Sequence, residues 1–279
     1  MDSFQQILNQ VPLLSRLKLQ GMGEPTLNKS LPNMLHEAEK RGISIQFNSN
    51  GTIMTDSLAK ELSGLKQTHL YFSLDGAKKE TFESVRVGSK FEKIKKNIGR
   101  LVEVRQGGGA LRVSAWMVLT RTNLPELNDV IRLVKELGLD TFTVQPNLCS
   151  WGQDEMKAYT EAQRVAEHPK LAGILDDAKK LAADIGVTFE VNQADAYSQK
   201  KKCPWPWTGA YVASNGDVVP CCILANSDTV KMGNLFEQSF KEIWNGPAYR
   251  EMRSRIARHD LPDYCTGCYR QDLPQGAEV

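Results

Sequence analysis

The chain has 279 residues, a hydrophobic content of 41%, a charged content of 24% and a formal net charge of +2 at neutral pH. This composition is that of a globular protein with one large core, and the small net charge gives no reason to expect binding to nucleic acid or to a membrane surface. No apolar run approaches the roughly 18 residues of a membrane span, and the first residues lack the basic and apolar regions of a signal peptide. We therefore expect a cytoplasmic protein whose cysteines bind metal rather than form disulfides.

Apolar residues along most of the chain follow two spacings. Helical spacing predicts helices at residues 4–11, 31–38, 58–65, 91–102 and 127–137. Short apolar runs predict strands at residues 17–20, 43–47, 69–73, 112–119, 142–145 and 187–191. Strands that alternate with helices in this way indicate an α/β fold with a parallel sheet, right-handed crossovers and helices outside.

Polar residues and breakers mark where these elements begin and end. Ser89–Glu92 has the pattern of a capping box, and Asn123 is expected to cap the helix that follows it. The pair His168–Pro169 is expected to break a polar helical stretch, and residues 195–202 are expected to form an exposed linker. Turns rich in glycine and asparagine follow several strands, and ligands of α/β folds bind at such strand ends.

Five of the six cysteines lie in the last third of the chain. Cys265 and Cys268 form a C-x-x-C pair, a spacing that lets two sulfurs turn toward one metal centre. Residues 216–222 end in two more cysteines, and Cys203 can supply a fourth sulfur. Four thiolates hold either a tetrahedral zinc ion or a cubane iron–sulfur cluster, and spacing alone does not choose between them. A structural metal staple without a catalytic role fits the same spacing, and Cys149, which has no partner in the sequence pattern, is expected to be a packed thiol.

The segments around these cysteines come in a fixed order: Cys203–Trp205, Gly216–Cys222, Met232–Leu235, Glu242–Asn245 and Cys265–Cys268. This order resembles the SPASM-type auxiliary-cluster domain of radical SAM enzymes, which binds a [4Fe–4S] cluster beyond the one that cleaves S-adenosylmethionine (SAM). The resemblance favours iron–sulfur over zinc. It implies one auxiliary [4Fe–4S] cluster, with Cys221 preferred to Cys222 because the family's ligand directly follows the Gly-Asp-x-x-Pro segment; the implied ligands are Cys203, Cys221, Cys265 and Cys268.

Turns nearer the N-terminus carry a second resemblance. The turn Gly21–Pro25 is similar to the glycine–glutamate–proline motif of radical SAM barrels, which binds the amino group of SAM. An ammonium group is satisfied by carbonyls and a carboxylate, and glycine lets the backbone approach closely. Residues 47–52 and 72–76 are similar to the turns after the next two strands, and residues 86–91 to the segment that follows. The resemblance implies SAM binding by Gly21, Gly23, Glu24, Asn48, Ser73 and Arg86, and it assigns no catalytic residue.

One motif of the family has no counterpart in this sequence. Radical SAM enzymes carry C-x-x-x-C-x-x-C after the first strand, ahead of the glycine–glutamate–proline turn, whereas the first cysteine of this chain is Cys149. We therefore expect a barrel that lacks its first strand and a chain that does not cleave SAM as it stands. It is either an N-terminally incomplete version of an active enzyme or a degenerate paralogue; the intact SAM-facing turns favour the first, and the coding DNA upstream of Met1 would decide.

Together the two resemblances imply an incomplete parallel (β/α) radical SAM-type partial barrel at residues 1–190 and a small, loop-rich iron–sulfur domain at residues 191–279. They imply hydrogen-atom abstraction, through a 5′-deoxyadenosyl radical, from a peptide, protein or small-metabolite substrate. A reducing electron donor is the expected partner, with no nucleic acid and no membrane. The alternative is a non-catalytic iron–sulfur or zinc-binding protein derived from this fold.

Overall fold

The computed structural model describes residues 1–146, 148–150, 153–165, 168–192 and 202–268. The chain divides into two compact units, the first made of residues 1–5, 13–148 and 161–192 and the second of residues 6–12, 149–160 and 193–279. The predicted linker at residues 195–202 lies outside the described residues except for Lys202. In the part of the chain that is described, no helix is both long and apolar enough to cross a membrane.

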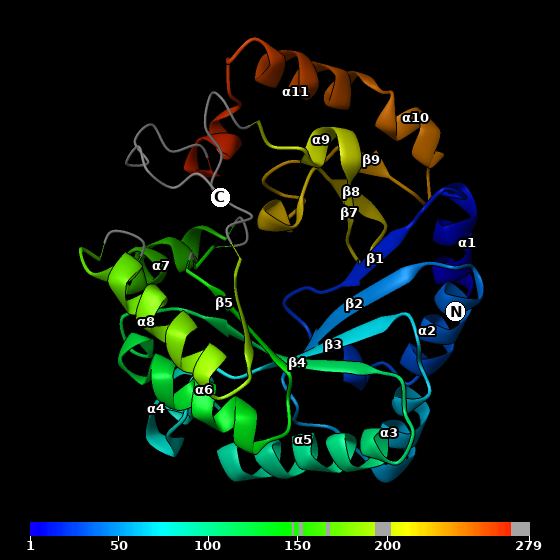
Figure 1. The fold of residues 1–279 in the computed structure, drawn as a ribbon. Helices are drawn as coiled ribbons and strands as arrows, with labels where there is room; N and C mark the ends of the chain where they lie inside the picture. Colours follow the sequence, from blue (N-terminus) through cyan, green and yellow to red (C-terminus); the bar gives the residue numbers. More distant parts are fainter. Residues whose placement is uncertain (147, 151–152, 166–167, 193–201, 269–279) are drawn as a thin grey trace. The chain divides into compact units, whose positions relative to one another are not determined.

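The first unit is built on a six-stranded sheet in which every neighbouring pair is parallel (Figure 1). The strands follow one another in chain order: β1 Arg16–Leu19, β2 Ser44–Ser49, β3 Thr68–Ser73, β4 Arg112–Val118, β5 Thr141–Gln145 and β6 Thr188–Val191. The predicted parallel α/β sheet is therefore confirmed. Because the strand order never reverses, right-handed crossovers place the connecting helices on one face of the sheet.

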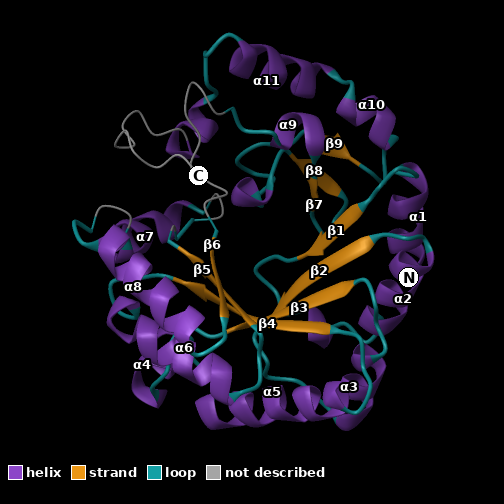
Figure 2. Ribbon diagram, in the orientation of Figure 1, coloured by secondary structure: helices purple, strands orange, loops and turns teal. Residues whose placement is uncertain are grey.

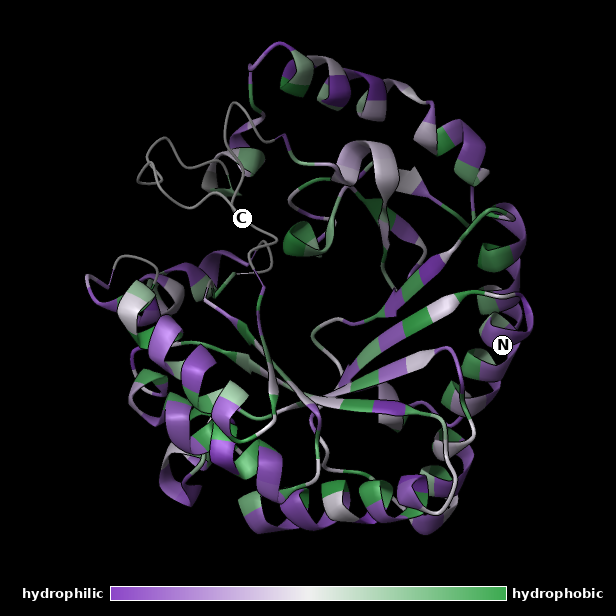
Figure 3. Ribbon diagram, in the orientation of Figure 1, coloured by the Kyte–Doolittle hydropathy of each residue, from purple (hydrophilic) through white to green (hydrophobic). Residues whose placement is uncertain are grey.

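Helices connect these strands and cover that face (Figure 2). Those that lie wholly in the first unit are α2 Leu31–Lys40, α3 Asp56–Ser63, α4 Lys79–Val85, α5 Phe91–Gln106, α6 Leu127–Glu136 and α8 Leu171–Asp184. Two further helices, α1 Asp2–Gln10 and α7 Lys157–Gln163, have residues in both units. The break between α7 and α8 contains the predicted breaker His168–Pro169. Helix α5 alternates between hydrophobic and hydrophilic turns along its length (Figure 3), as expected for a helix with one buried side.

The two faces of the sheet differ in chemistry. The helix-covered face is apolar, and the following side chains on it are at most 1% exposed: Ile45, Phe47, Leu70, Phe72, Ala115, Met117, Phe142 and Val144. Each large side chain among them contributes about 1.5–3 kcal/mol through burial. Because side chains alternate along a strand, the registers give the opposite face, termed the polar face, Lys18, Gln46, Asn48, His69, Tyr71, Ser73, Arg112, Ser114, Trp116, Thr143 and Glu190.

Two predicted helix caps are wrong. Helix α5 begins after Lys90 without a side-chain cap, so Ser89–Glu92 is not a capping box; instead Glu83 of α4 accepts a hydrogen bond from the Phe91 amide, at 3.1 Å. Asn123 does not cap the helix after it either. Its buried side chain accepts from the Thr120 amide and donates to the carbonyls of Asp75 and Val118, so tertiary partners replace the local cap.

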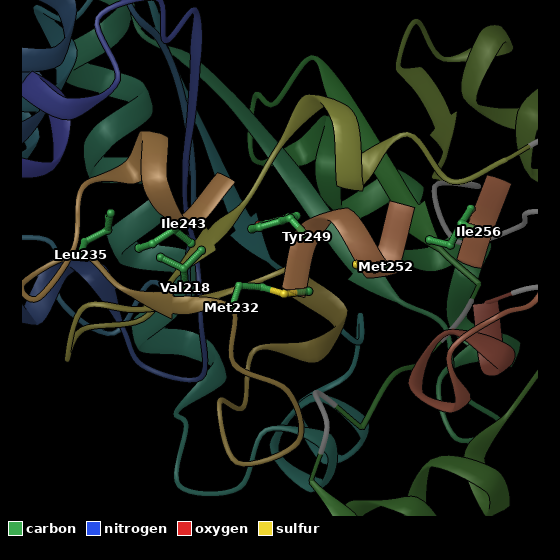
Figure 4. Close-up of a cluster of buried hydrophobic side chains, with 7 residues drawn as sticks. All are labelled: Val218, Met232, Leu235, Ile243, Tyr249, Met252 and Ile256. Carbon is green, nitrogen blue, oxygen red and sulfur yellow. The ribbon is translucent and has the colours of Figure 1, made fainter. Parts of the chain in front are cut away.

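The second unit has a small antiparallel sheet of β7 Tyr211–Val212, β8 Asp217–Val219 and β9 Gly233–Asn234. Its helices are α9 Trp205–Thr208, α10 Phe240–Trp244 and α11 Pro247–Ala257. The sheet, α10 and α11 share one core of Val218, Met232, Leu235, Ile243, Tyr249, Met252 and Ile256 (Figure 4). Gln10 of α1 belongs to this unit and accepts a hydrogen bond from the Phe240 amide, at 2.7 Å.

Candidate cofactor sites

A tight hairpin presents Cys221 at its end. Gly216 lies in the turn of this hairpin, between β7 and β8, with a φ of 85°, and a Cβ atom there would lie 2.5 Å from the Phe236 ring and 2.9 Å from Asn234 Oδ1. Only glycine can adopt this positive φ while leaving room for the neighbouring side chains. Strand β8 starts directly after Gly216 and runs into Pro220 and Cys221, so the turn and the cysteine belong to one short segment.

Asp217 fixes the hairpin to the strand beside it. Its carboxylate accepts hydrogen bonds from Asn234 Nδ2 and Asn215 Nδ2, both at 2.9 Å, and forms an ion pair with Lys231. The hydrogen bonds from Lys231 and Asn234 hold the pKa of Asp217 well below its usual range. Asn234 also donates to the Asn215 carbonyl and accepts from the Phe236 amide. The Gly-Asp and Gly-Asn pairs of the sequence pattern therefore act as a framework for Cys221.

Four cysteines line one small cavity. Cys203 precedes α9, Cys221 follows β8, and Cys265 and Cys268 lie on the 3-10 helix Asp263–Cys268. The remaining walls are apolar or aromatic: Trp205, Ile223, Leu224, Met252, Ile256 and Tyr264. These four cysteines are the ones that the sequence pattern singled out, and Cys222 is not among the lining residues.

The environment of this cavity suits soft metal ligands. Burial, and then the neighbouring thiols Cys268 and Cys203, raise the pKa of Cys265 to about 12, and burial likewise raises the pKa of Cys221. Thiols in an apolar cavity stay protonated unless a bound cation stabilises their ionised form. Among the described residues, no group of three or more His, Cys, Asp and Glu side chains is arranged to hold a metal ion. Four thiols that line one apolar cavity have the donor chemistry of an iron–sulfur cluster.

Arg253 of α11 ties the Cys203 segment to the two helices after the sheet. Its Nε donates to the Pro206 carbonyl and its Nη1 to the Trp244 carbonyl, each at 2.7 Å. Its guanidinium also lies over the rings of Trp244 and Tyr249, at 4.4 and 4.9 Å from the ring centres. The sequence pattern gave no sign of this residue, because its hydrogen-bond partners are backbone carbonyls.

The second candidate site lies at the carboxyl ends of β1, β2 and β3. Glu24 follows β1, and its Oε1 accepts from the Thr26 amide, the Thr26 hydroxyl and the Ser49 hydroxyl, at 3.1, 2.6 and 2.8 Å. Its Oε2 accepts from the Asn50 amide at 2.7 Å. With four donors from its own chain, this carboxylate holds the turn after β1 against the turn after β2.

Acceptors near this turn remain available to a ligand. Asn48, near the end of β2, has a buried Oδ1 atom without a hydrogen-bond partner among the described residues. Ser73 ends β3 and shares the polar face with Asn48. A Cβ atom on Gly23 would meet nothing within 4 Å, and Gly21 lies in the same exposed turn. An unsatisfied buried acceptor requires a donor, and the amino group of SAM is a donor of the right kind.

Arg86, another of the predicted SAM-binding residues, forms an ion pair within the protein. Its Nη2 pairs with Asp75 Oδ2 at 2.6 Å, and Asp75 Oδ1 accepts from the Val118 amide at 2.8 Å. The side chains are 25% and 6% exposed, so this ion pair is largely buried rather than a surface pair. Arg86 thus braces the turn after β3, while its Nε is buried without a partner in the described part of the chain.

Two sequence families match the chain in the regions that hold these sites. The radical SAM superfamily model matches residues 3–134, and the SPASM iron–sulfur cluster-binding domain model matches residues 203–269. The chain therefore carries a radical SAM domain followed by a SPASM domain. Its SPASM match begins at Cys203 and contains all four cavity cysteines, and its radical SAM match contains every candidate SAM-binding residue.

Relatives of this radical SAM chain include proteins that act on cofactors and peptides. It is 27% identical to the tungsten-containing aldehyde ferredoxin oxidoreductase cofactor-modifying protein of Pyrococcus furiosus, over 97% of this chain and 79% of that protein. It is 24% identical to the PqqA peptide cyclase of Xanthomonas euvesicatoria, over 91% of this chain and 67% of that protein.

Solved radical SAM structures share the fold. Streptococcus suis SuiB bound to its precursor peptide SuiA has a TM-score of 0.71 at 18% identity, over 90% of this chain and 60% of that chain. The anSMEcpe structure with bound AdoMet has a TM-score of 0.62 at 17% identity, over 95% of this chain and 85% of that chain. This radical SAM chain therefore spans about 60% of the length of SuiB.

Proposed function

We propose that this chain is a peptide-modifying radical SAM/SPASM protein, whose family chemistry is hydrogen-atom abstraction from the substrate, and that these 279 residues hold SAM and an auxiliary cluster without cleaving SAM themselves. The auxiliary [4Fe–4S] cluster is held by Cys203, Cys221, Cys265 and Cys268, and SAM is held at the carboxyl ends of β1, β2 and β3. The observation that carries the proposal is the single cavity lined by those four cysteines within the SPASM match. The peptide substrate is proposed because the PqqA peptide cyclases and SuiB are among its relatives.

In the family, SAM and the cluster that cleaves it supply the hydrogen-abstracting radical. The auxiliary cluster would accept an electron or bind the substrate. The chain's own residues position and shield them. Glu24 holds the turn that faces the SAM amino group, and Asn48 Oδ1 offers that group an acceptor. Trp205, Met252 and Ile256 keep water from the cysteine sulfurs.

Iron loading tests the metal part of the proposal. Anaerobic reconstitution with iron and sulfide is expected to give about four iron per chain, with the brown absorption of a cubane cluster. Cys265→Ala is expected to lose this iron, whereas Cys149→Ala and Cys222→Ala are expected to keep it, because neither lines the cavity. Stoichiometric zinc without iron would overturn the proposal.

A non-catalytic iron–sulfur or zinc-binding protein is the second candidate. It is favoured by one observation, the cavity lined by four thiols, because such a thiol set binds zinc or an iron–sulfur cluster without any SAM chemistry. The chain is therefore expected to bind SAM weakly and to release no 5′-deoxyadenosine when reconstituted and incubated with SAM and dithionite. Sub-micromolar SAM binding in calorimetry, or catalytic release of 5′-deoxyadenosine, would show that the SAM-cleaving centre is misassigned.

A further inference from the structure

The turn after β2 is held by two sets of hydrogen bonds, one from the turn after β1 and one from helix α5. In the first set, Glu24 accepts from the Ser49 hydroxyl and the Asn50 amide, at 2.8 and 2.7 Å. The second set comes from α5, which packs against α3 on the helix-covered side of the sheet (Figure 1). The position of this turn therefore depends on α5 as well as on Glu24.

Asn97 of α5 contacts the turn at Gly51. Its side chain is 5% exposed, and its Nδ2 donates to the Gly51 carbonyl at 2.8 Å. Gly51 has a φ of 72°, and a Cβ atom there would lie 3.1 Å from Ile94 Cγ2 on the same helix. The backbone of the turn thus lies directly against α5, in a conformation that favours glycine.

Arg100, three residues further along α5, extends this contact. Its Nη1 donates to the Met54 carbonyl at 2.6 Å and to Asn97 Oδ1 at 3.2 Å, and its Nε pairs with Asp56 Oδ1 at 2.6 Å. Both ends of the Asn97 amide are therefore bonded, the acceptor to Arg100 and the donor to Gly51. An amide bonded at both ends is a rigid point of attachment for the turn.

We propose that Asn97 is a positioning residue for SAM, which acts by fixing the turn after β2. The inference rests on the proposed function, because it requires the candidate SAM site at the carboxyl ends of β1, β2 and β3. Asn48 and Ser49 directly precede the turn, so a shift of the Gly51 backbone also moves the unsatisfied Asn48 Oδ1 atom and the hydroxyl that bonds Glu24. Groups that touch a ligand keep their geometry only when further contacts hold them in place.

Asn97→Asp tests this role on the full reconstituted chain, because it removes the donor to Gly51 and keeps an acceptor for Arg100. The bond from Asn50 to Glu24 is expected to open more often, so hydrogen exchange followed by NMR should be about tenfold faster at the Asn50 amide. Equilibrium dialysis with labelled SAM is expected to show about tenfold weaker binding, since loss of one buried hydrogen bond is of that order.

Val130→Ala on α6 is the matched control, because it removes fully buried apolar volume from a helix that packs against α8 and β5. At a temperature where every variant is folded, it should change neither readout. Arg100→Gln, at a partly exposed position, tests the same attachment if Asn97→Asp does not fold, and is expected to give both changes in smaller measure. Its control is Arg132→Gln, since Arg132 is exposed and pairs with Asp129 on its own helix.

The outcomes separate this inference from the proposed function. Unchanged exchange at Asn50 in Asn97→Asp, or an equal increase in Val130→Ala, would overturn the positioning role while wild-type SAM binding stays intact. Faster exchange with unchanged SAM affinity would also overturn it, because Asn97 would then support the fold alone. Wild-type protein that binds no SAM would overturn the SAM site of the proposed function, and with it the role of Asn97 toward SAM.

Discussion

Asp217 illustrates how a single carboxylate determines the shape of a cofactor loop. It bonds Asn234 and Asn215 and pairs with Lys231, and these contacts hold the hairpin that leads to Cys221. Because they favour the ionised carboxylate, they lower its pKa in the folded protein. A group of this kind stabilises the fold above its unfolded pKa of about 3.9 and loses that contribution as the pH falls below it.

Asp217→Asn is therefore expected to destabilise the metal-free protein at pH 7, and the difference from wild type is expected to shrink as the pH falls below about 4. Urea unfolding of both proteins from neutral to acidic pH measures this difference. A difference that stays constant over the whole range would mean that the charge of Asp217 is not what stabilises the hairpin.

Glu24 is a second carboxylate that holds a loop in place, here the turn after β1. Glu24→Ala leaves the Ser49 hydroxyl and the Asn50 amide without their acceptor, and is expected to lower the free energy of unfolding by about 2 kcal/mol. Glu24→Gln keeps one acceptor oxygen and is expected to cost less. Denaturant unfolding checks the order of the two variants, and an unchanged stability in Glu24→Ala would show that the carboxylate does not hold the turns together.

The grouping of the four cysteines that line the cavity was predictable from the sequence, but the residues that support the two units were not. The four cavity cysteines could be grouped because thiols at these spacings are rare and have few uses. Glu126 and Arg253 could not be found, because each acts on backbone groups: Glu126 accepts from the Ala77 and Lys78 amides, and Arg253 donates to two carbonyls. Every residue offers such groups, so the sequence carries no signal for these partners.

At the scale of elements, two caps were mispredicted and helix α4 was missed for the same reason: the sequence does not show which tertiary contacts a segment will make. The local pattern at Ser89 predicted a cap, but the Ser89 amide bonds back to the Arg86 carbonyl and Glu83 supplies the acceptor for α5. The sheet was predictable because its short apolar runs alternate regularly with helical segments, and burial of one face enforces that pattern over whole strands. Caps involve one or two bonds, which tertiary contacts readily replace.

Arg253 sets the arrangement of α9, α10 and α11. Arg253→Lys keeps the charge but cannot donate to both carbonyls while lying flat on two rings. It is expected to lower the free energy of unfolding of the second unit by about 2 kcal/mol and to reduce iron retention. Arg250→Lys, exposed on the same helix, is the matched control. Equal stability of the two variants in thermal unfolding would contradict this role.

At the scale of the whole molecule, the two units have separate means of stabilisation. The first buries a continuous apolar sheet face under its helices. The second has a small core and a cavity lined by four thiols, of which Cys221 and Cys265 have raised pKa values. Small units with little core depend on bound metal for stability. Metal should therefore stabilise the second unit far more than the first.

Iron removal by a chelator is the experiment that checks this difference. The amide of Met232, which bonds the Val218 carbonyl at 2.8 Å, is expected to exchange its hydrogen faster once iron is gone, because opening of the second unit no longer requires loss of bound metal. Amides of Phe47 and Leu70, in the middle of the parallel sheet, are expected to keep their protection. Hydrogen exchange followed by mass spectrometry resolves the two regions. Equal loss in both would mean that the units unfold as one cooperative body, so that metal bound in the second also stabilises the first.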